Sequence, residues 1–448
     1  MVTYPFPDDF IFGAATASYQ IEGYPLADGA APSVWHDFSH KRGKTGNGDT
    51  GDIACDFYHR YPEDIQNVKD LGCGAFRFSV SWPRIVPEPG KVNQKGLDFY
   101  SRVVDELLTQ GITPMCTLFH WDAPRWFAEK GGFTVRDSVN YIRDYADVLF
   151  RALGDRVKMW NTINEPMVYA VYGYLFGWSP PGKKLHFRKY LHTAHYLLLS
   201  HAEIVRAFRS SGNTGKIGIA QNQIWMWPFR QDNEKDKAAA QRMDAIVNRF
   251  YMDPLFFGTY PETVTEIAGK RMPAGFENDL SSMQEPGDFV SINYYMRQRY
   301  KHHPLVPMLK ARTKNKRKPE LKEDWSAMWE IYPSGLLSLL LRLKEEYGNP
   351  ECYVTENGYP LPEEDGKPVY DDQPRIKYLS DHLKEVSRAI DKGVNVKGFF
   401  VWSLMDNFEW SFGNKMRFGL IRTDFETLER KWKQSAYWYR DVIANRAV

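Results

Sequence analysis

Two glutamates stand out because each is followed at once by residues that turn the chain. Glu165 precedes Pro166, and Glu356 precedes Asn357 and Gly358. A proline disfavours the α conformation in the residue before it, so we expect an extended backbone at Glu165. Cleavage of a glycosidic bond needs one carboxylic acid that protonates the leaving oxygen and one carboxylate that attacks the sugar or activates water. A single glutamate is usually ion-paired or solvated, so the hypothesis rests on the pair.

Eight short runs rich in β-branched and aromatic residues are predicted to form strands. They are Phe10–Gln20, Ala75–Trp82, Ile112–His120, Val157–Glu165, Ile217–Asn222, Phe289–Tyr295, Cys352–Glu356 and Gly398–Asn407. Segments with helical periodicity lie between them, and three of these end before Gly72, Gly111 and Gly393, as a helix C-terminus favours. Strands alternating with helices, without a linker, predict one α/β domain over residues 1–448, a single (β/α)₈ TIM barrel with long loops at the C-terminal face of its strands.

Polar and aromatic residues gather at the ends of these runs. They are Gln20, His120, Asn164, Glu165, Asn222, Asn293, Tyr295, Glu356 and Trp402. A parallel barrel brings the C-terminal ends of all its strands into one cup, where the active sites of this fold are built. We therefore expect residues hundreds of positions apart to face a single ligand.

The composition narrows the possible functions. The chain has 448 residues with 58 Lys and Arg against 56 Asp and Glu, and this net charge of +2 argues against binding to nucleic acid through phosphates. No run of about 18 apolar residues predicts a membrane span, and the N-terminus lacks the pattern of a secretory signal. The four cysteines lack the spacing of a zinc site or a disulfide framework, so we expect a reducing cytoplasm.

Several motifs resemble those of family 1 glycoside hydrolases of the β-glucosidase type. They extend over nearly the whole chain and include FIFGAATASYQIEG, RFSVSWPRI, TLFHWDAP, TINEP, INYY, YVTENG and VWSLMDNFEW. The resemblance implies a retaining mechanism without metal or cofactor, in which Glu165 is the general acid/base and Glu356 is the nucleophile. It also implies that Arg77, Tyr295 and Asn293 orient Glu356, and that the peptide bond between Trp402 and Ser403 is cis.

The resemblance further implies where the substrate binds. The residues expected to hold the non-reducing sugar are Gln20, His120, Trp121, Asn164, Trp402, Glu409 and Trp410. A sugar ring has an apolar face and a rim of hydroxyls, so Trp402 would supply the flat wall and polar groups the hydrogen bonds. The candidates for the leaving-group side are Trp329, Met167, Asn222, Phe412 and Trp35. Relatives often have tryptophan where Met167 stands, and methionine offers no flat platform.

The expected substrate is a small-molecule β-glycoside from which a terminal, non-reducing β-D-glucosyl unit is removed. Glu409 would repel a phosphate, which favours an unphosphorylated sugar. A β-galactosidase, a β-fucosidase or a transglycosylase of the same family are alternatives, and a non-catalytic sugar-binding barrel is the alternative from another class. The oligomeric state is left open by the sequence.

Three other patterns are given structural interpretations. Gly46–Gly51 matches a dinucleotide-binding loop, but a basic stretch precedes it instead of a strand. His192, His195 and His201 lie in a leucine-rich helical segment, which favours packing over metal binding. The basic run Lys310–Lys322 is interpreted as a solvated loop, with steering of anionic leaving groups as the alternative.

Overall fold

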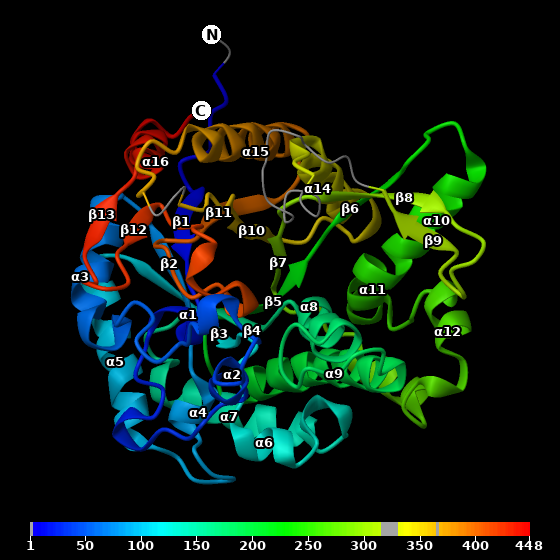
Figure 1. Ribbon diagram of the computed structural model, residues 1–448, viewed down its shortest axis with the longest axis horizontal. Helices are drawn as coiled ribbons and strands as arrows, with labels where there is room; N and C mark the ends of the chain where they lie inside the picture. The colour runs from blue at the N-terminus through cyan, green and yellow to red at the C-terminus, as the bar shows by residue number, and fades with distance from the viewer. Residues whose placement is uncertain (1–2, 315–329, 364–366) are drawn as a thin grey trace.

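A closed barrel of parallel strands forms the centre of the computed structural model, which describes residues 3–314, 330–363 and 367–448 (Figure 1). Around the barrel the strand order is β1-β11-β10-β7-β5-β4-β3-β2. The barrel strands are β1 (Ile11–Ala15), β2 (Ala75–Ser79), β3 (Thr113–Phe119), β4 (Met159–Asn164), β5 (Lys216–Asn222), β7 (Phe289–Asn293), β10 (Cys352–Asn357) and β11 (Val396–Trp402). Each predicted run overlaps one of these strands, although β5, β10 and β11 extend one or two residues beyond the predicted bounds. The predicted (β/α)₈ architecture is confirmed.

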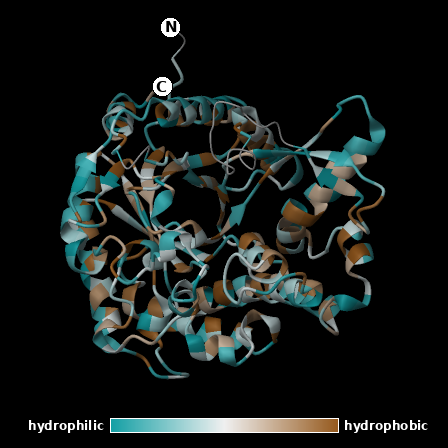
Figure 2. Cartoon of the chain, in the orientation of Figure 1, coloured by the Kyte–Doolittle hydropathy of each residue, from teal (hydrophilic) through white to brown (hydrophobic). Residues whose placement is uncertain are grey.

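Helices surround the barrel, and their ribbons carry both hydrophilic and hydrophobic bands (Figure 2). They are α1 (Ser18–Ile21), α2 (Val34–Ser39), α3 (Phe57–Asp70), α4 (Trp82–Ile85), α5 (Gln94–Thr109), α6 (Arg125–Glu129), α7 (Ser138–Leu153), α8 (Pro166–Val171), α9 (Phe187–Ser210), α10 (Glu234–Asp244), α11 (Phe250–Phe257), α12 (Glu262–Ala268), α13 (Leu280–Met283), α14 (Pro333–Glu346), α15 (Gln373–Asp391) and α16 (Gln434–Asn445). Gly72, Gly111 and Gly393 follow α3, α5 and α15 with φ of 77°, 73° and 78°. The predicted helix ends are confirmed.

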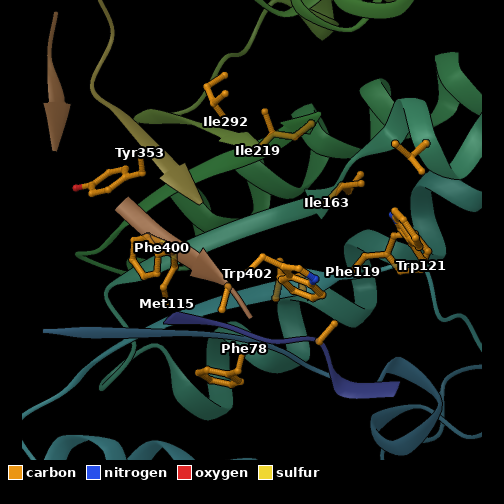
Figure 3. Packing of buried hydrophobic residues seen from close by; sticks show 14 of the residues in the cluster. Phe78, Met115, Phe119, Trp121, Ile163, Ile219, Ile292, Tyr353, Phe400 and Trp402 are labelled. Carbon is orange, nitrogen blue, oxygen red and sulfur yellow. The ribbon is translucent and has the colours of Figure 1, made fainter. Parts of the chain in front are cut away.

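The barrel strands bury side chains on both of their faces, as strands covered by helices do (Figure 3). On β2, the Phe76 ring packs 6.3 Å from that of Phe57 on α3. Its neighbour Arg77 points the opposite way, into the barrel, where its Nε donates to Thr117 Oγ1 at 3.2 Å. Alternation along a strand thus separates an apolar layer against the helices from a polar interior.

Segments inserted after the C-terminal ends of the barrel strands build additional structure around the mouth. β6 (Trp225–Pro228) follows β5, and β8 (Arg297–His302) with β9 (Ala311–Thr313) follows β7; together they form a three-stranded sheet. This sheet lies beside α10 on the right of Figure 1. β12 (Ile421–Thr423) and β13 (Arg430–Trp432) form an antiparallel pair after β11. The predicted long loops at this face are therefore confirmed.

The segment around Tyr4 lies beside the C-terminus, since Tyr4 N–H donates to Val448 O at 3.0 Å. None of the helices in the described ranges is long and apolar enough to cross a membrane. Of the basic run Lys310–Lys322, only the part up to Lys314 is described, and the remainder lies outside the described residues.

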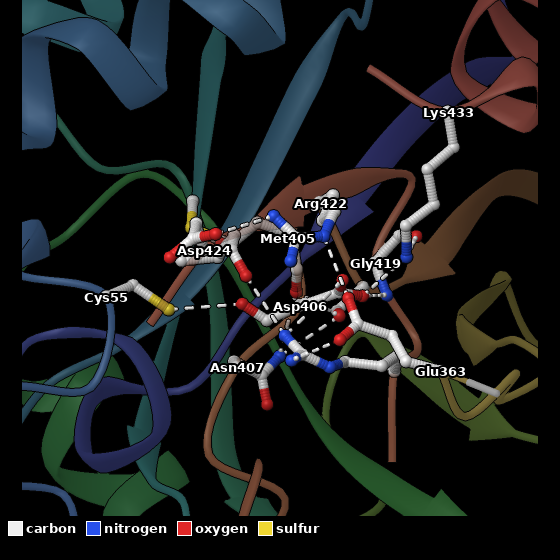
Figure 4. Close-up of polar contacts among 12 residues, drawn as sticks. Cys55, Glu363, Met405, Asp406, Asn407, Gly419, Arg422, Asp424 and Lys433 are labelled. Atoms are coloured by element: carbon white, nitrogen blue, oxygen red, sulfur yellow. Dashed lines mark hydrogen bonds and ion pairs between the residues drawn. The ribbon is translucent and has the colours of Figure 1, made fainter. Parts of the chain in front are cut away.

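A buried ion pair fixes the segment that follows β11 (Figure 4). The Lys433 ammonium donates to Asp406 Oδ1 at 2.6 Å and to Gly419 O at 2.9 Å, and the Gly419 N–H also donates to Asp406 Oδ1. Burial lowers the pKa of Lys433 to about 8. The next residue, Asn407, accepts a hydrogen bond from Gln20 at 3.0 Å. This pair therefore supports the segment that links β11 to the residues near Glu409.

Replacing Asp406 by alanine is expected to destabilise the fold strongly, because Lys433 would remain buried without its counter-charge. We expect a loss of about 3–5 kcal/mol in the free energy of unfolding, measured by urea denaturation at pH 7. Adding Lys433→Met to Asp406→Ala removes the stranded charge and is expected to recover a large part of this loss.

The matched control is Asp441→Ala, since Asp441 pairs with Arg440 on the surface and is 63% exposed. A surface pair of this kind contributes about 0–1 kcal/mol. Equal stability of the Asp406→Ala and Asp441→Ala proteins would show that the buried pair does not hold the fold.

Candidate active site

Both glutamates line a cavity of about 360 Å³ at the C-terminal end of the barrel. The lining residues are Trp35, His120, Trp121, Glu165, Met167, Val168, Tyr172, Trp178, Ser179, Asn222, Ile224, Tyr295, Met296, Glu356, Trp402, Glu409, Trp410, Ser411, Phe412 and Phe418. They come from loops and strand ends all around the barrel, as the sequence predicts. Among the residues that line it, the carboxylic acids are three glutamates, Glu165, Glu356 and Glu409.

Glu356 is the residue before the last of β10, and both of its carboxyl oxygens accept hydrogen bonds. Arg77 Nη1 donates to Oε1 at 2.5 Å, and the Tyr295 hydroxyl donates to Oε2 at 2.6 Å. Arg77 is fully buried, so this ion pair is poorly screened by solvent. The two donors fix the orientation of the Glu356 carboxyl group.

The expectation of an extended backbone at Glu165 is wrong. This residue has φ 47° and ψ 64°, in the left-handed region, and it is the N-cap of α8, whose first residue is Pro166. Proline excludes only the right-handed α region for the residue before it. The chain turns from β4 into α8 within one residue, and Tyr169 N–H already donates to Glu165 O at 3.1 Å. The left-handed conformation makes this sharp turn.

The surroundings of the Glu165 side chain differ in charge from those of Glu356. Its Oε1 accepts hydrogen bonds from two neutral amides, Asn222 Nδ2 at 3.1 Å and Asn293 Nδ2 at 2.9 Å. Burial first and the negative charge of Glu356 second raise the pKa of Glu165 to about 8, although both amides oppose this shift. Glu165 is therefore protonated at neutral pH. Asn293, expected to orient Glu356, instead contacts Glu165.

Asn164 links these groups to His120. Its Oδ1 accepts hydrogen bonds from Arg77 Nη2 at 2.6 Å and from Asn293 Nδ2 at 3.1 Å, which leaves Nδ2 to face His120 Nε2 at 3.0 Å. An amide nitrogen only donates, so His120 Nε2 accepts and the ring proton lies on Nδ1. Burial and then the charge of Arg77 lower the pKa of His120 well below its usual value. His120 is neutral, and its Nδ1–H has no partner within the described residues.

Gln20 and Glu409 form a second polar pair. Gln20 Nε2 donates to Glu409 Oε2 at 3.1 Å and also to Asn407 Oδ1 and Phe408 O. Gln20 Oε1 is buried and has no partner within the described residues. Burial raises the pKa of Glu409 to about 8, with further contributions from the charges of the other two glutamates. These two side chains can therefore offer both acceptor and donor groups to a ligand.

Stacked rings form the wall opposite these polar groups. His120 stacks on Trp402 with centroids 5.8 Å apart and on Trp410 with centroids 6.0 Å apart. Trp121 packs on Trp410 at 5.0 Å, and its indole N–H donates to Asn164 O at 3.0 Å. The peptide bond between Trp402 and Ser403 is cis, as the resemblance implies. The wall provides flat apolar surface beside neutral and acidic groups.

Most of the predicted site residues line the cavity, but some do not. Gln20, Arg77, Asn164 and Asn293 are fully buried and lie behind the lining residues, where they orient them. Trp329 lies outside the described residues. The lining residues that the sequence analysis missed are Val168, Tyr172, Trp178, Ser179, Ile224, Met296, Ser411 and Phe418. Four of them, Val168, Tyr172, Trp178 and Ser179, lie within the 14 residues that follow Glu165, so proximity to the TINEP motif is a usable signal.

Groups that could hold a metal lie elsewhere. Within the described residues, the group of three metal-type ligands is His36, His40 and Asp52, and none of these lines the cavity. Of the helical histidines, His195 contacts Asp279 at 3.0 Å and His201 contacts Thr162 at 2.8 Å, inside the packed body of the protein. These two rings therefore take part in packing, as their sequence context indicates.

Comparisons with known proteins agree on one family. The family model described as glycosyl hydrolase family 1 matches residues 2–448. The 1,4-beta-D-glucan glucohydrolase of Thermotoga neapolitana is 46% identical over 448 residues, which cover 99% of each chain. Beta-glucosidase A of Thermotoga maritima is 46% identical and covers 99% of this chain and 98% of its own. A solved structure of the family 1 b-glucosidase from T. maritima matches with a TM-score of 0.94, 44% identity and complete coverage of both chains.

Replacing Glu356 by glutamine is expected to lower the pKa of Glu165, because it removes the negative charge that helps to raise it. The pKa should remain above that of an ordinary glutamate, since Glu165 stays buried. Carboxyl ¹³C NMR titration, with Glu165→Gln used to assign the signal, measures both values.

Glu351→Gln is the control, because Glu351 precedes β10 and pairs with Lys216 at 2.7 Å, away from the cavity. It should leave the titration of Glu165 unchanged. An unchanged pKa in the Glu356→Gln protein would mean that burial alone causes the shift.

Proposed function

Because the chain belongs to glycosyl hydrolase family 1, we propose that it is a retaining β-glucosidase that removes terminal β-D-glucosyl units from small-molecule glycosides. The observation that carries this proposal is the contrast between two glutamates in one cavity. Glu356 is paired with a buried guanidinium, whereas Glu165 contacts neutral amides and has a pKa of about 8. A retaining glycosidase needs this pair, one ionised nucleophile and one protonated acid.

In the first step, the Glu356 carboxylate attacks the anomeric carbon from the face opposite the leaving group. The bond from this carbon to the leaving oxygen breaks, and Glu165 transfers its proton to that oxygen as it departs. Tyr295 and Arg77 hold Glu356 in position for the attack. The product of this step is a glycosyl ester of Glu356, which carries no charge.

In the second step, water attacks the anomeric carbon of the ester and transfers a proton to Glu165. Ester formation has removed the charge of Glu356, so one of the causes that raise the pKa of Glu165 is absent. Glu165 can then be ionised and act as a base. Attack on the face opposite the ester regenerates the Glu356 carboxylate and retains the β configuration.

The residues around the glutamates supply the binding groups that a sugar needs. Trp402 provides a flat wall for the apolar face of the ring. The His120 Nδ1–H has no partner among the described residues and His120 lines the cavity, so it can bond a hydroxyl. Glu409 can bind two neighbouring hydroxyls, and Gln20, behind the lining, donates to Glu409 and holds it in place. Trp121, Trp410 and Asn164 complete the sugar side by packing and orientation. We assign Met167, Asn222, Phe412 and Trp35 to the leaving-group side of the site. All four line the cavity.

Further aspects of the proposal follow from the same observations. The names of the relatives support glucose as the preferred sugar. The family match and the barrel support a single catalytic domain over the whole chain. The four cysteines are buried thiols, which supports work in a reducing compartment such as the cytoplasm. The two-step mechanism needs neither a metal nor a cofactor.

Glu356→Gly is expected to lower the hydrolysis of nitrophenyl β-D-glucoside by a factor on the order of 10⁴ or more, because no nucleophile remains. Added azide can enter the space left by the side chain, attack the anomeric carbon and displace nitrophenolate. The expected product is α-glucosyl azide, with inverted configuration, identified by ¹H NMR.

Glu351→Gly is the matched control on the same part of the chain, and it should keep ordinary turnover. Ordinary turnover in the Glu356→Gly protein would overturn the nucleophile assignment. An inactive wild-type protein would favour a non-catalytic sugar-binding barrel.

Among nitrophenyl β-glycosides, the glucoside is expected to have the highest kcat/KM. The hydroxyls of glucose are all equatorial, so a carboxyl group in the position of Glu409 can bind two neighbours in the ring plane. An axial hydroxyl, as in galactose and fucose, leaves that plane and weakens the contact. A higher kcat/KM for the galactoside or the fucoside would contradict the assignment of glucose.

A further inference from the structure

The mouth of the cavity is formed by side chains that are far more exposed than the glutamates inside. Trp178 and Phe412 are 45% and 43% exposed, whereas Glu165 and Glu356 are 5% and 3% exposed, and all four line the same cavity. The sugar that reacts must reach the glutamates, so its leaving group lies between them and the mouth. Trp178 and Phe412 therefore lie on the path that the leaving group occupies.

Neighbouring groups hold Trp178 in place. Its ring packs against those of Tyr172 and Phe176, with centroids 5.2 Å and 4.8 Å away. The backbone N–H of Trp178 donates to Tyr172 O at 3.0 Å. The Ser411 hydroxyl donates to Trp178 O, which ties this loop to the one that carries Phe412. An indole that is packed in this way and still half exposed loses little freedom when a ring stacks on it.

Apart from the glutamates, much of the cavity surface is apolar. Met167, Val168, Ile224 and Met296 line it, and Ser179 Oγ is a buried polar atom without a partner in the described part of the chain. Of the described lining residues, the three glutamates are the only carboxylic acids, and no lysine or arginine lines the cavity. A second sugar would need several hydrogen-bonding partners for its hydroxyls, whereas an aromatic group needs flat apolar area.

We propose that Trp178 determines leaving-group specificity: leaving groups stack on its indole, and the protein prefers flat, uncharged aromatic leaving groups to a second sugar. This inference rests on the proposed function as a β-glucosidase and extends it to the second half of the substrate. Trp178 contacts the leaving group alone, so it acts on the first step and leaves hydrolysis of the glycosyl ester unchanged.

Four glucosides separate these effects. β-D-Glucosyl fluoride has a leaving group too small to reach Trp178, phenyl and 2-naphthyl β-D-glucosides differ in flat area with leaving groups of similar acidity, and cellobiose releases a sugar. In the native protein, kcat/KM should be higher for the naphthyl than for the phenyl glucoside. Trp178→Ala should lower kcat/KM for the naphthyl glucoside about tenfold or more, and the phenyl glucoside less. Hydrolysis of the fluoride should not change.

Two further variants separate stacking from a general disturbance. Phe257→Ala removes a ring that is equally exposed, at 45%, but packs on Phe256 and Tyr347 and does not line the cavity. It should leave kcat/KM for all four substrates unchanged. Trp178→Phe keeps a flat ring and should keep most of the preference for the naphthyl glucoside.

Each possible result bears on a definite claim. Native kcat/KM for the naphthyl glucoside in Trp178→Ala would overturn the stacking role of Trp178. An equal or larger loss with cellobiose would overturn the preference for aromatic leaving groups and make a sugar the occupant. A native protein that cannot hydrolyse glucosyl fluoride would instead refute the proposed function, because that substrate does not depend on Trp178.

Discussion

The site depends on keeping two chemically identical carboxyl groups in different charge states inside one cavity. Both glutamates are buried, and burial alone would favour the neutral form of each. Arg77 breaks this symmetry, because its guanidinium reaches Glu356 and the amides of Asn222 and Asn293 reach Glu165. The charge held on Glu356 then disfavours a second charge on Glu165. One buried cation thus assigns different chemistry to each carboxyl group.

The same guanidinium organises the sugar side. Its second arm binds Asn164 Oδ1, which turns the amide nitrogen toward His120 and places the free proton of that ring on Nδ1. Arginine suits this task because it remains charged and its donors diverge in a fixed plane. The two catalytic candidates and a group that can bind a sugar hydroxyl are therefore coupled through a single side chain. A lysine at this position could not hold both partners in the same way.

The barrel, its eight strands and the glutamate pair were predictable from sequence because they depend on local pattern and on motif. Glu165 shows the limit of a local rule. Proline disfavours the right-handed α conformation in Glu165, but the turn into α8 selects the left-handed conformation over the extended one. Asn293 lies at the predicted strand end, but which glutamate it contacts depends on the relative position of two strands. The pairing of Asp406 with Lys433 joins residues on separate segments and has no local signature. Trp178 can likewise be recognised as a cavity residue only from the folded structure.

The two sides of the cavity are built on different physical principles, and this difference determines how they can change. On the sugar side, polar groups are buried and bound to one another, so replacing Gln20 or Asn164 leaves several partners unsatisfied at a cost of about 1–3 kcal/mol for each group. At the mouth, the surface is apolar and half exposed, and Trp178 contributes area more than hydrogen bonds. Exchanging one apolar side chain for another there leaves no buried polar group unpaired. The apolar residues at the mouth can therefore be exchanged at a smaller cost than the hydrogen-bonded polar residues deeper in the cavity.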